Sequence, residues 1–82
     1  MDNTLLVGKS LGFAQAMRIA EGMSYKHDQV IVKARGKQIQ RAVEIATMLQ
    51  IRERAIIVST DIGYNNEIQV PNVSIILDSN KD

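Results

Sequence analysis

The chain has 82 residues, the size of one domain, which excludes a multidomain enzyme. Ten Lys and Arg against nine Asp and Glu leave a formal net charge of +1, a total that does not by itself suggest a nucleic-acid-binding protein. With no Cys, no Trp, one Phe and two Tyr, the core must be aliphatic and can contain neither a disulfide nor a thiolate-bound metal. A domain this small buries only roughly 60 to 65% of its unfolded surface, so we expect self-association to add stability.

The chain carries no visible targeting or membrane segment. No run approaches the roughly 20 apolar residues that a membrane span needs. Near the start, Asp2 stands where a secretory signal would carry positive charge. We therefore expect a soluble, cytoplasmic protein.

The first third of the chain predicts a strand, a turn and a helix. Residues 3–8 form a short apolar run that ends in Gly8, which favours a buried strand and a turn. Ser10 is expected to cap the helix that follows. From residue 12 to residue 23, apolar side chains recur at spacings of three and four, which predicts an amphipathic helix: Phe13, Ala16, Met17, Ala20 and Met23.

The middle of the chain repeats this order. Residues 28–35 alternate between apolar and more polar positions, which predicts a second strand, and Gly36 ends it. Before this strand, the single histidine, His27, is expected in a solvated loop. From residue 38 to residue 52 a second helix is predicted, with one apolar stripe: Ile39, Ala42, Val43, Ala46 and Leu49.

The last third predicts a hairpin. Residues 55–62 are rich in β-branched side chains, residues 63–66 (GYNN) have turn chemistry, and residues 73–77 form a second apolar run. Because Pro71 has no backbone N–H, the returning strand is expected to be an edge strand or to be irregular in its first half.

The order β-α-β-α-β-β predicts one domain over residues 1–82. We expect an α/β sandwich, with two helices on one face of a four-stranded mixed sheet and the hairpin as a C-terminal arm. Charge is divided unevenly along this fold. Residues 1–54 carry nine basic and five acidic side chains, whereas residues 55–82 carry Lys81 alone against four acids. A near-neutral total therefore conceals a basic part and an acidic part.

The most specific stretch is residues 32–44, VKARGKQIQRAVE. It places Arg35 and Lys37 on either side of Gly36, where a strand meets the positive end of a helix. Free amides and cationic side chains there favour phosphate oxygens, and Arg41 lies one helical turn further on. Spacing alone leaves open the alternative that these are ordinary solvated charges.

This stretch closely resembles the conserved core of the Alba family of archaeal chromatin proteins, and LLVGK at residues 5–9 resembles the family's first strand and loop. The resemblance spans most of residues 4–77. It implies a non-enzymatic homodimer that binds double-stranded DNA, and often RNA, in association with the chromosome or nucleoid.

The resemblance also implies roles for individual residues. The loop lysine is Lys9, beside Ser10, and the strand-exit residues are Arg35, Gly36 and Lys37. Lys33 and Arg41 would be supporting contacts. The loop lysine is reversibly acetylated in some members, which implies a lysine acetylase and deacetylase as partners. The family's hairpins lie along the minor groove, where Tyr64 could stack on a base and Asn65 could hydrogen-bond.

Three departures from the family pattern matter. Many members have a second lysine and a proline after the loop lysine, where this chain has Ser10 and Leu11. Residues 55–80 contain no Lys or Arg, although family arms commonly carry them, and the arm is short. We therefore expect weaker or more sequence-dependent DNA binding than is typical. The alternatives are an RNA-directed protein of the same fold and a dimeric interaction domain that binds no nucleic acid.

Other chemistries find little support. Gly8, Lys9 and Ser10 resemble the end of a nucleotide-binding P-loop, but the glycine that the motif requires five residues earlier is Asn3. A single histidine offers little to a metal site or a catalytic dyad. We expect no cofactor and no metal.

Overall fold

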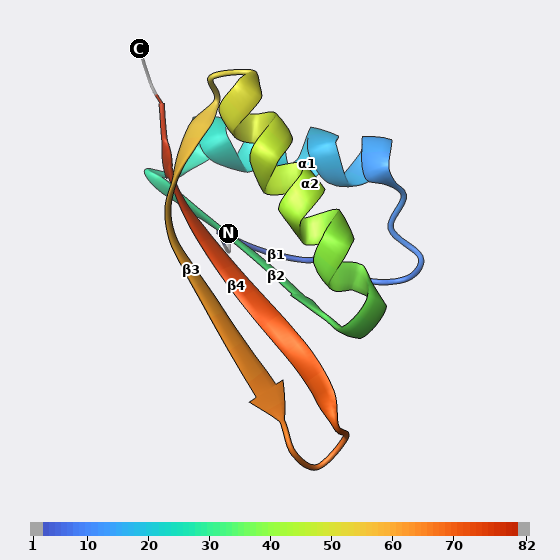
Figure 1. The fold of residues 1–82 in the computed structure, drawn as a ribbon. Helices are drawn as coiled ribbons and strands as arrows, with labels where there is room; N and C mark the ends of the chain where they lie inside the picture. Colours follow the sequence, from blue (N-terminus) through green and yellow to red (C-terminus); the bar gives the residue numbers. More distant parts are fainter. Residues whose placement is uncertain (1–2, 81–82) are drawn as a thin grey trace.

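The computed structural model describes residues 3–80 and shows an elongated α/β sandwich of 42 × 25 × 24 Å (Figure 1). The elements in chain order are β1 (Thr4–Leu6), α1 (Phe13–Lys26), β2 (Gln29–Arg35), a 3₁₀ turn (Gly36–Gln38), α2 (Ile39–Ile51), β3 (Ala55–Asn65) and β4 (Val70–Ser79). The predicted order and the two helices on one face of a mixed sheet are confirmed. Neither helix is long and apolar enough to cross a membrane.

The sheet has the strand order β1-β2-β4-β3, with β1 parallel to β2 and the other pairs antiparallel. Alternate residues of β2 face the helices, and Val30 and Val32 are fully buried there. The other large side chains that are fully buried are Leu77 of β4 and Ile45 and Leu49 of α2. The core is therefore aliphatic, as the composition requires.

Both helices differ in detail from the sequence prediction. Helix α1 starts after Gly12, with no side-chain cap, so the expectation that Ser10 caps it is wrong. On α2 the buried stripe is Ala42, Ile45, Ala46 and Leu49, and Val43 is 45% exposed. The buried residues follow Ala42 at spacings of three and four, and this series contains Ile45 but not Val43.

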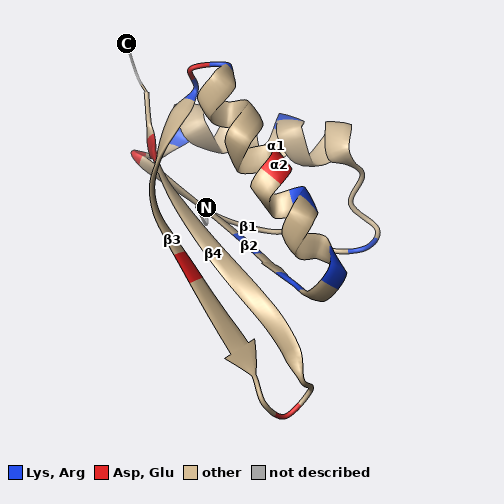
Figure 2. Ribbon diagram, viewed as in Figure 1, with Lys and Arg blue, Asp and Glu red and all other residues tan. Residues whose placement is uncertain are grey.

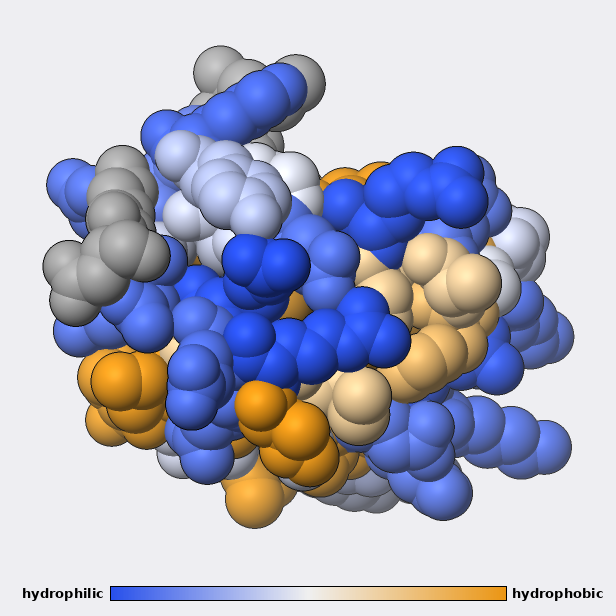
Figure 3. Space-filling view, turned by 90° about the horizontal axis from the view of Figure 1, so that it is seen from above, coloured by the Kyte–Doolittle hydropathy of each residue, from blue (hydrophilic) through white to orange (hydrophobic). Residues whose placement is uncertain are grey.

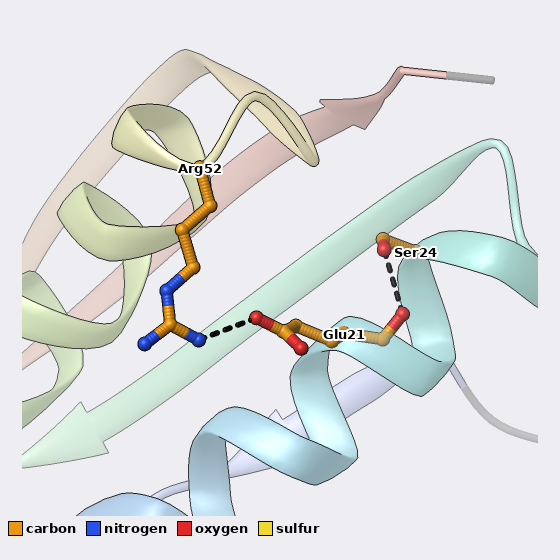
Figure 4. Close-up of polar contacts among 3 residues, drawn as sticks. All are labelled: Glu21, Ser24 and Arg52. Atoms are coloured by element: carbon orange, nitrogen blue, oxygen red, sulfur yellow. Dashed lines mark hydrogen bonds and ion pairs between the residues drawn. The ribbon is translucent and has the colours of Figure 1, made fainter. Parts of the chain in front are cut away.

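The two helices are joined at one end by an ion pair. Arg52 Nη1 donates to Glu21 Oε1 at 2.7 Å, and Ser24 Oγ, one turn along α1, donates to the Glu21 carbonyl oxygen (Figure 4). At the same end of α1, the His27 N–H donates to the Met23 carbonyl at 2.9 Å. His27 Nε2 is buried without a hydrogen-bond partner in the described chain. His27 is therefore a half-buried helix cap, and the expectation of a solvated loop histidine is wrong.

The hairpin is longer than the sequence suggests. Strand β3 continues through Tyr64 to Asn65, so the predicted turn at residues 63–66 is wrong, and the turn is at residues 66–69. Gln69 takes the left-handed backbone conformation there, with φ 53°. Asn65 Oδ1 accepts the Glu67 N–H at 3.0 Å, which gives this turn a side-chain acceptor.

The returning strand β4 is an inner strand, so the prediction of an edge strand is wrong. It pairs with β2 from Asn72 to Asp78 and with β3 along its whole length. Pro71 lies one residue beyond the last pair with β2, so its missing N–H leaves no gap in that ladder. The edge strand of the hairpin is β3, which carries a bulge between Ile57 and Ser59.

Gly36 has a φ of 60°, and a Cβ there would lie 3.2 Å from Val70 Cγ1. We expect Gly36→Ala to lower the free energy of unfolding by about 1–2 kcal/mol, because a non-glycine residue is strained in this region. The matched control is Gly22→Ala within α1, where no atom lies within 4 Å of the added Cβ. That change should stabilise by about 0.5–1 kcal/mol. Chemical denaturation measures the free energy of unfolding of both variants. Equal changes in the two would contradict the conclusion that Gly36 is needed for its positive φ.

Candidate nucleic-acid interface

Two segments meet at one end of the sheet, the loop between β1 and α1 and the junction between β2 and α2. The Val7 N–H donates to the Lys33 carbonyl at 2.9 Å, which carries the β1–β2 pairing one residue past β1. Arg41 Nη1 of α2 donates to the Leu11 carbonyl oxygen of the loop at 2.7 Å. These bonds hold the loop that contains Lys9 beside the strand exit that contains Arg35.

The cations predicted for this end are exposed. None of the four forms an ion pair or a side-chain hydrogen bond within residues 3–80: Lys9, Lys33, Arg35 and Lys37. Figure 2 shows basic residues at the β1–α1 loop and at the β2–α2 junction, while the arm carries only acidic charges. The structure thus brings the predicted loop and strand-exit residues together, with Ser10 exposed in the loop and Gly36 at the turn.

Arg41 differs from the other predicted contacts. It is half-buried, and one of its nitrogens is committed to Leu11. Its position therefore supports the Lys9 loop as well as adding positive charge near it.

The predicted arm residues lie just past the end of β2, where the hairpin leaves the body. Tyr64 is 57% exposed and pairs with Pro71, and Asn65 uses its side-chain oxygen within the turn. The amide group of Asn65 remains a donor. The arm strands and turn carry Asp61 and Glu67 and no Lys or Arg, so the arm offers polar and apolar contacts and no cation.

The structure adds residues that the sequence did not single out. The sheet face away from the helices contains an open trough of about 580 Å³ at the end of β1, β2 and β4. Its polar and apolar lining includes Leu6, Gly8, Lys33, Arg35, Asn72 and Ser74. Asn72 lies opposite Arg35, and Ser74 opposite Lys33. No local sequence signal marks Asn72 or Ser74, because their place here depends on a strand register across about forty residues.

Asn72 also shapes the root of the arm. Its Oδ1 lies 2.8 Å from the position that a Cβ on Gly63 would take. Because Gly63 has no side chain, the Asn72 side chain of β4 can pack over the backbone of β3 at that position. Within residues 3–80, no group of His, Asp and Glu side chains could hold a metal ion.

The Alba family model matches residues 3–66, more than half of the chain. The chain belongs to the Alba family. Its structure is similar to that of ALBA1 from Trypanosoma brucei, with a TM-score of 0.86 and 19% identity, covering 94% of this chain and 68% of that one. It is also similar to Alba from Thermoplasma volcanium, with a TM-score of 0.79 and 21% identity, covering 92% and 98%.

Membership confirms the resemblance seen in residues 5–9 and 32–44 and the expected fold. The Alba family consists of nucleic-acid-binding proteins that are not enzymes, which agrees with the absence of any catalytic assignment from the sequence. The exposed cations at the loop and strand exit are therefore the candidate nucleic-acid interface of this Alba-family chain.

Arg41→Ala should lower the free energy of unfolding by about 1–2 kcal/mol, because it leaves the Leu11 carbonyl without its charged donor. Lys37→Ala, four residues earlier and exposed, should change it by less than about 0.5 kcal/mol. Urea denaturation of both variants checks this. If Arg41→Ala is as stable as Lys37→Ala, Arg41 does not hold the loop.

Proposed function

We propose that this protein is a homodimer that binds double-stranded DNA through phosphate contacts of Lys9, Arg35 and Lys37 from both subunits. The observation that carries the proposal is the group of exposed cations without ion-pair partners in the described chain, gathered at one end of an Alba-family fold. Lys33 and Arg41 add positive potential beside them. RNA is the second ligand, because phosphate contacts do not by themselves distinguish the two nucleic acids.

The arm contributes shape and polar contact in this proposal. Asp61 and Glu67 would repel phosphates. The arm would therefore contact the minor groove of DNA through Tyr64 and the side-chain amide of Asn65. Binding should consequently be weaker than in a relative with basic arms.

The dimer is proposed to form over α2 and β3. Exposed apolar side chains lie on both elements, and Figure 3 shows apolar side chains at the surface along the lower edge of that view. Gln50 Oε1 of α2 accepts the Ile57 N–H of β3 at 3.0 Å, so the two elements form one continuous face. The exposed apolar residues of this face are Val43, Ile51, Val58 and Ile62. A second copy would bury surface that the small core leaves open.

Lys9 is proposed as an acetylation site for a lysine acetylase and deacetylase. Its side chain is exposed in a turn and forms no ion pair in the described chain. Acetylation would remove one cationic phosphate contact from each subunit. We further propose that the protein acts in the cytoplasm on the chromosome, as a chromatin-type protein.

Salt dependence tests the phosphate contacts. With three or four cations per subunit, a dimer on duplex DNA should give a slope of log K against log salt of about −5 to −7. Arg35→Ala with Lys37→Ala should make the slope shallower by about 3 to 4, since four contacts are lost per dimer. The control is Lys26→Ala with Arg54→Ala, at the opposite end of the sheet. A wild-type slope near zero would support the interaction domain that binds no nucleic acid.

Charge on the proposed dimer face should separate the subunits. We expect Ile51→Glu with Val58→Glu to shift the protein to monomers in sedimentation equilibrium, because two carboxylates per subunit would be buried at the contact. The control is Leu6→Glu, a 70% exposed apolar residue on the open face of the sheet. Dimers in the double variant, or monomers in the control, would place the interface elsewhere.

A further inference from the structure

The trough on the open face of the sheet has the size and chemistry of a nucleotide site. Its volume of about 580 Å³ falls in the range of roughly 300–1,000 Å³ that small-molecule sites occupy. Lys33 and Arg35 supply two exposed cations, and no acidic residue lines it. This lining favours an anionic ligand.

The neighbours of these cations suit the rest of a nucleotide. Ser74 and Asn72 stand opposite Lys33 and Arg35 in the register of β2 and β4, and they provide a hydroxyl and an amide. On the other side, Leu6 is paired with Lys33 and is 70% exposed. The hydrogen-bonding groups on one side can hold a phosphate, and the apolar surface on the other can hold the face of a base.

Resting on the nucleic-acid binding proposed above, we propose that this trough binds an unpaired nucleotide of a single strand. The phosphate lies beside Lys33 and Arg35 on the β4 side, where Asn72 and Ser74 donate to its oxygens, and the base face packs on Leu6 on the β1 side. Gly8 borders the trough with no atom within 4 Å of its missing side chain, which leaves the entrance open.

A paired base would not fit this description. In a duplex each base face is covered by its neighbours in the stack, so the apolar surface of Leu6 would have no partner. An unpaired base can be splayed out onto such a surface.

The test compares single strands with a duplex. Single-stranded RNA and DNA of about eight nucleotides, a length typical of single-strand sites, and a DNA duplex are titrated by fluorescence anisotropy. Asn72→Asp keeps the side-chain shape and replaces a donor with a negative charge in the trough. The matched control is Asn66→Asp, the same charge change in the exposed arm turn.

We expect Asn72→Asp to weaken single-strand binding about tenfold more than Asn66→Asp does. On the duplex the difference between the two variants should be smaller, because there the new carboxylate acts only through Arg35, which lies opposite it. Leu6→Ser, which removes the apolar surface, should show the same selectivity for the single strand. The octamer that binds more tightly identifies the strand.

Equal losses for the two Asp variants on the single strand would overturn the proposal, because they would show an effect of charge at long range. So would an unshifted Asn72 side-chain amide signal in the NMR spectrum of the wild-type protein at saturating octamer. The salt slope on duplex DNA tests the proposed function separately, and it can hold while the trough proposal fails.

Discussion

The pairing of β2 with β4 is the constraint on which the rest of the structure depends. Seven residue pairs, from Gln29 with Asp78 to Arg35 with Asn72, align the two inner strands. One face of this pair buries Val32 and Ile75 beneath the helices. Strand β2 ends at Arg35, opposite Asn72. The part of the hairpin between Gly63 and Asn72 therefore pairs with no third strand and forms the arm. The same pairing thus determines the core, the arm and the trough.

This geometry separates the charges that composition adds together. The exposed cations lie at the β1–α1 loop and the β2 exit, whereas the hairpin carries Asp61 on β3 and Glu67 in its turn (Figure 2). A net charge of +1 therefore describes neither region. An anionic ligand is attracted to the body and repelled from the arm, which reverses the usual contribution of a basic arm.

Much of the fold could be predicted from the sequence because its signals are local. Hydrophobic periodicity placed both helices, and β-branched runs placed the strands. The errors fall where tertiary contacts decide. Ile45 is buried and Val43 is not, because the position of α2 on the sheet selects the stripe. The turn lies past Asn65 because Gly63 is used for close approach to Asn72 and not for a turn.

The candidate site divides in the same way. Lys9, Arg35 and Lys37 could be found from a motif, since each stands next to a glycine at the end of a strand. Asn72 could not, because only the β2–β4 register brings it opposite Arg35. Yet Asn72 both lines the trough and packs over Gly63 at the root of the arm. A ligand in the trough would therefore contact the strand at the point where the arm leaves the body, so the body and the arm would meet it as one surface.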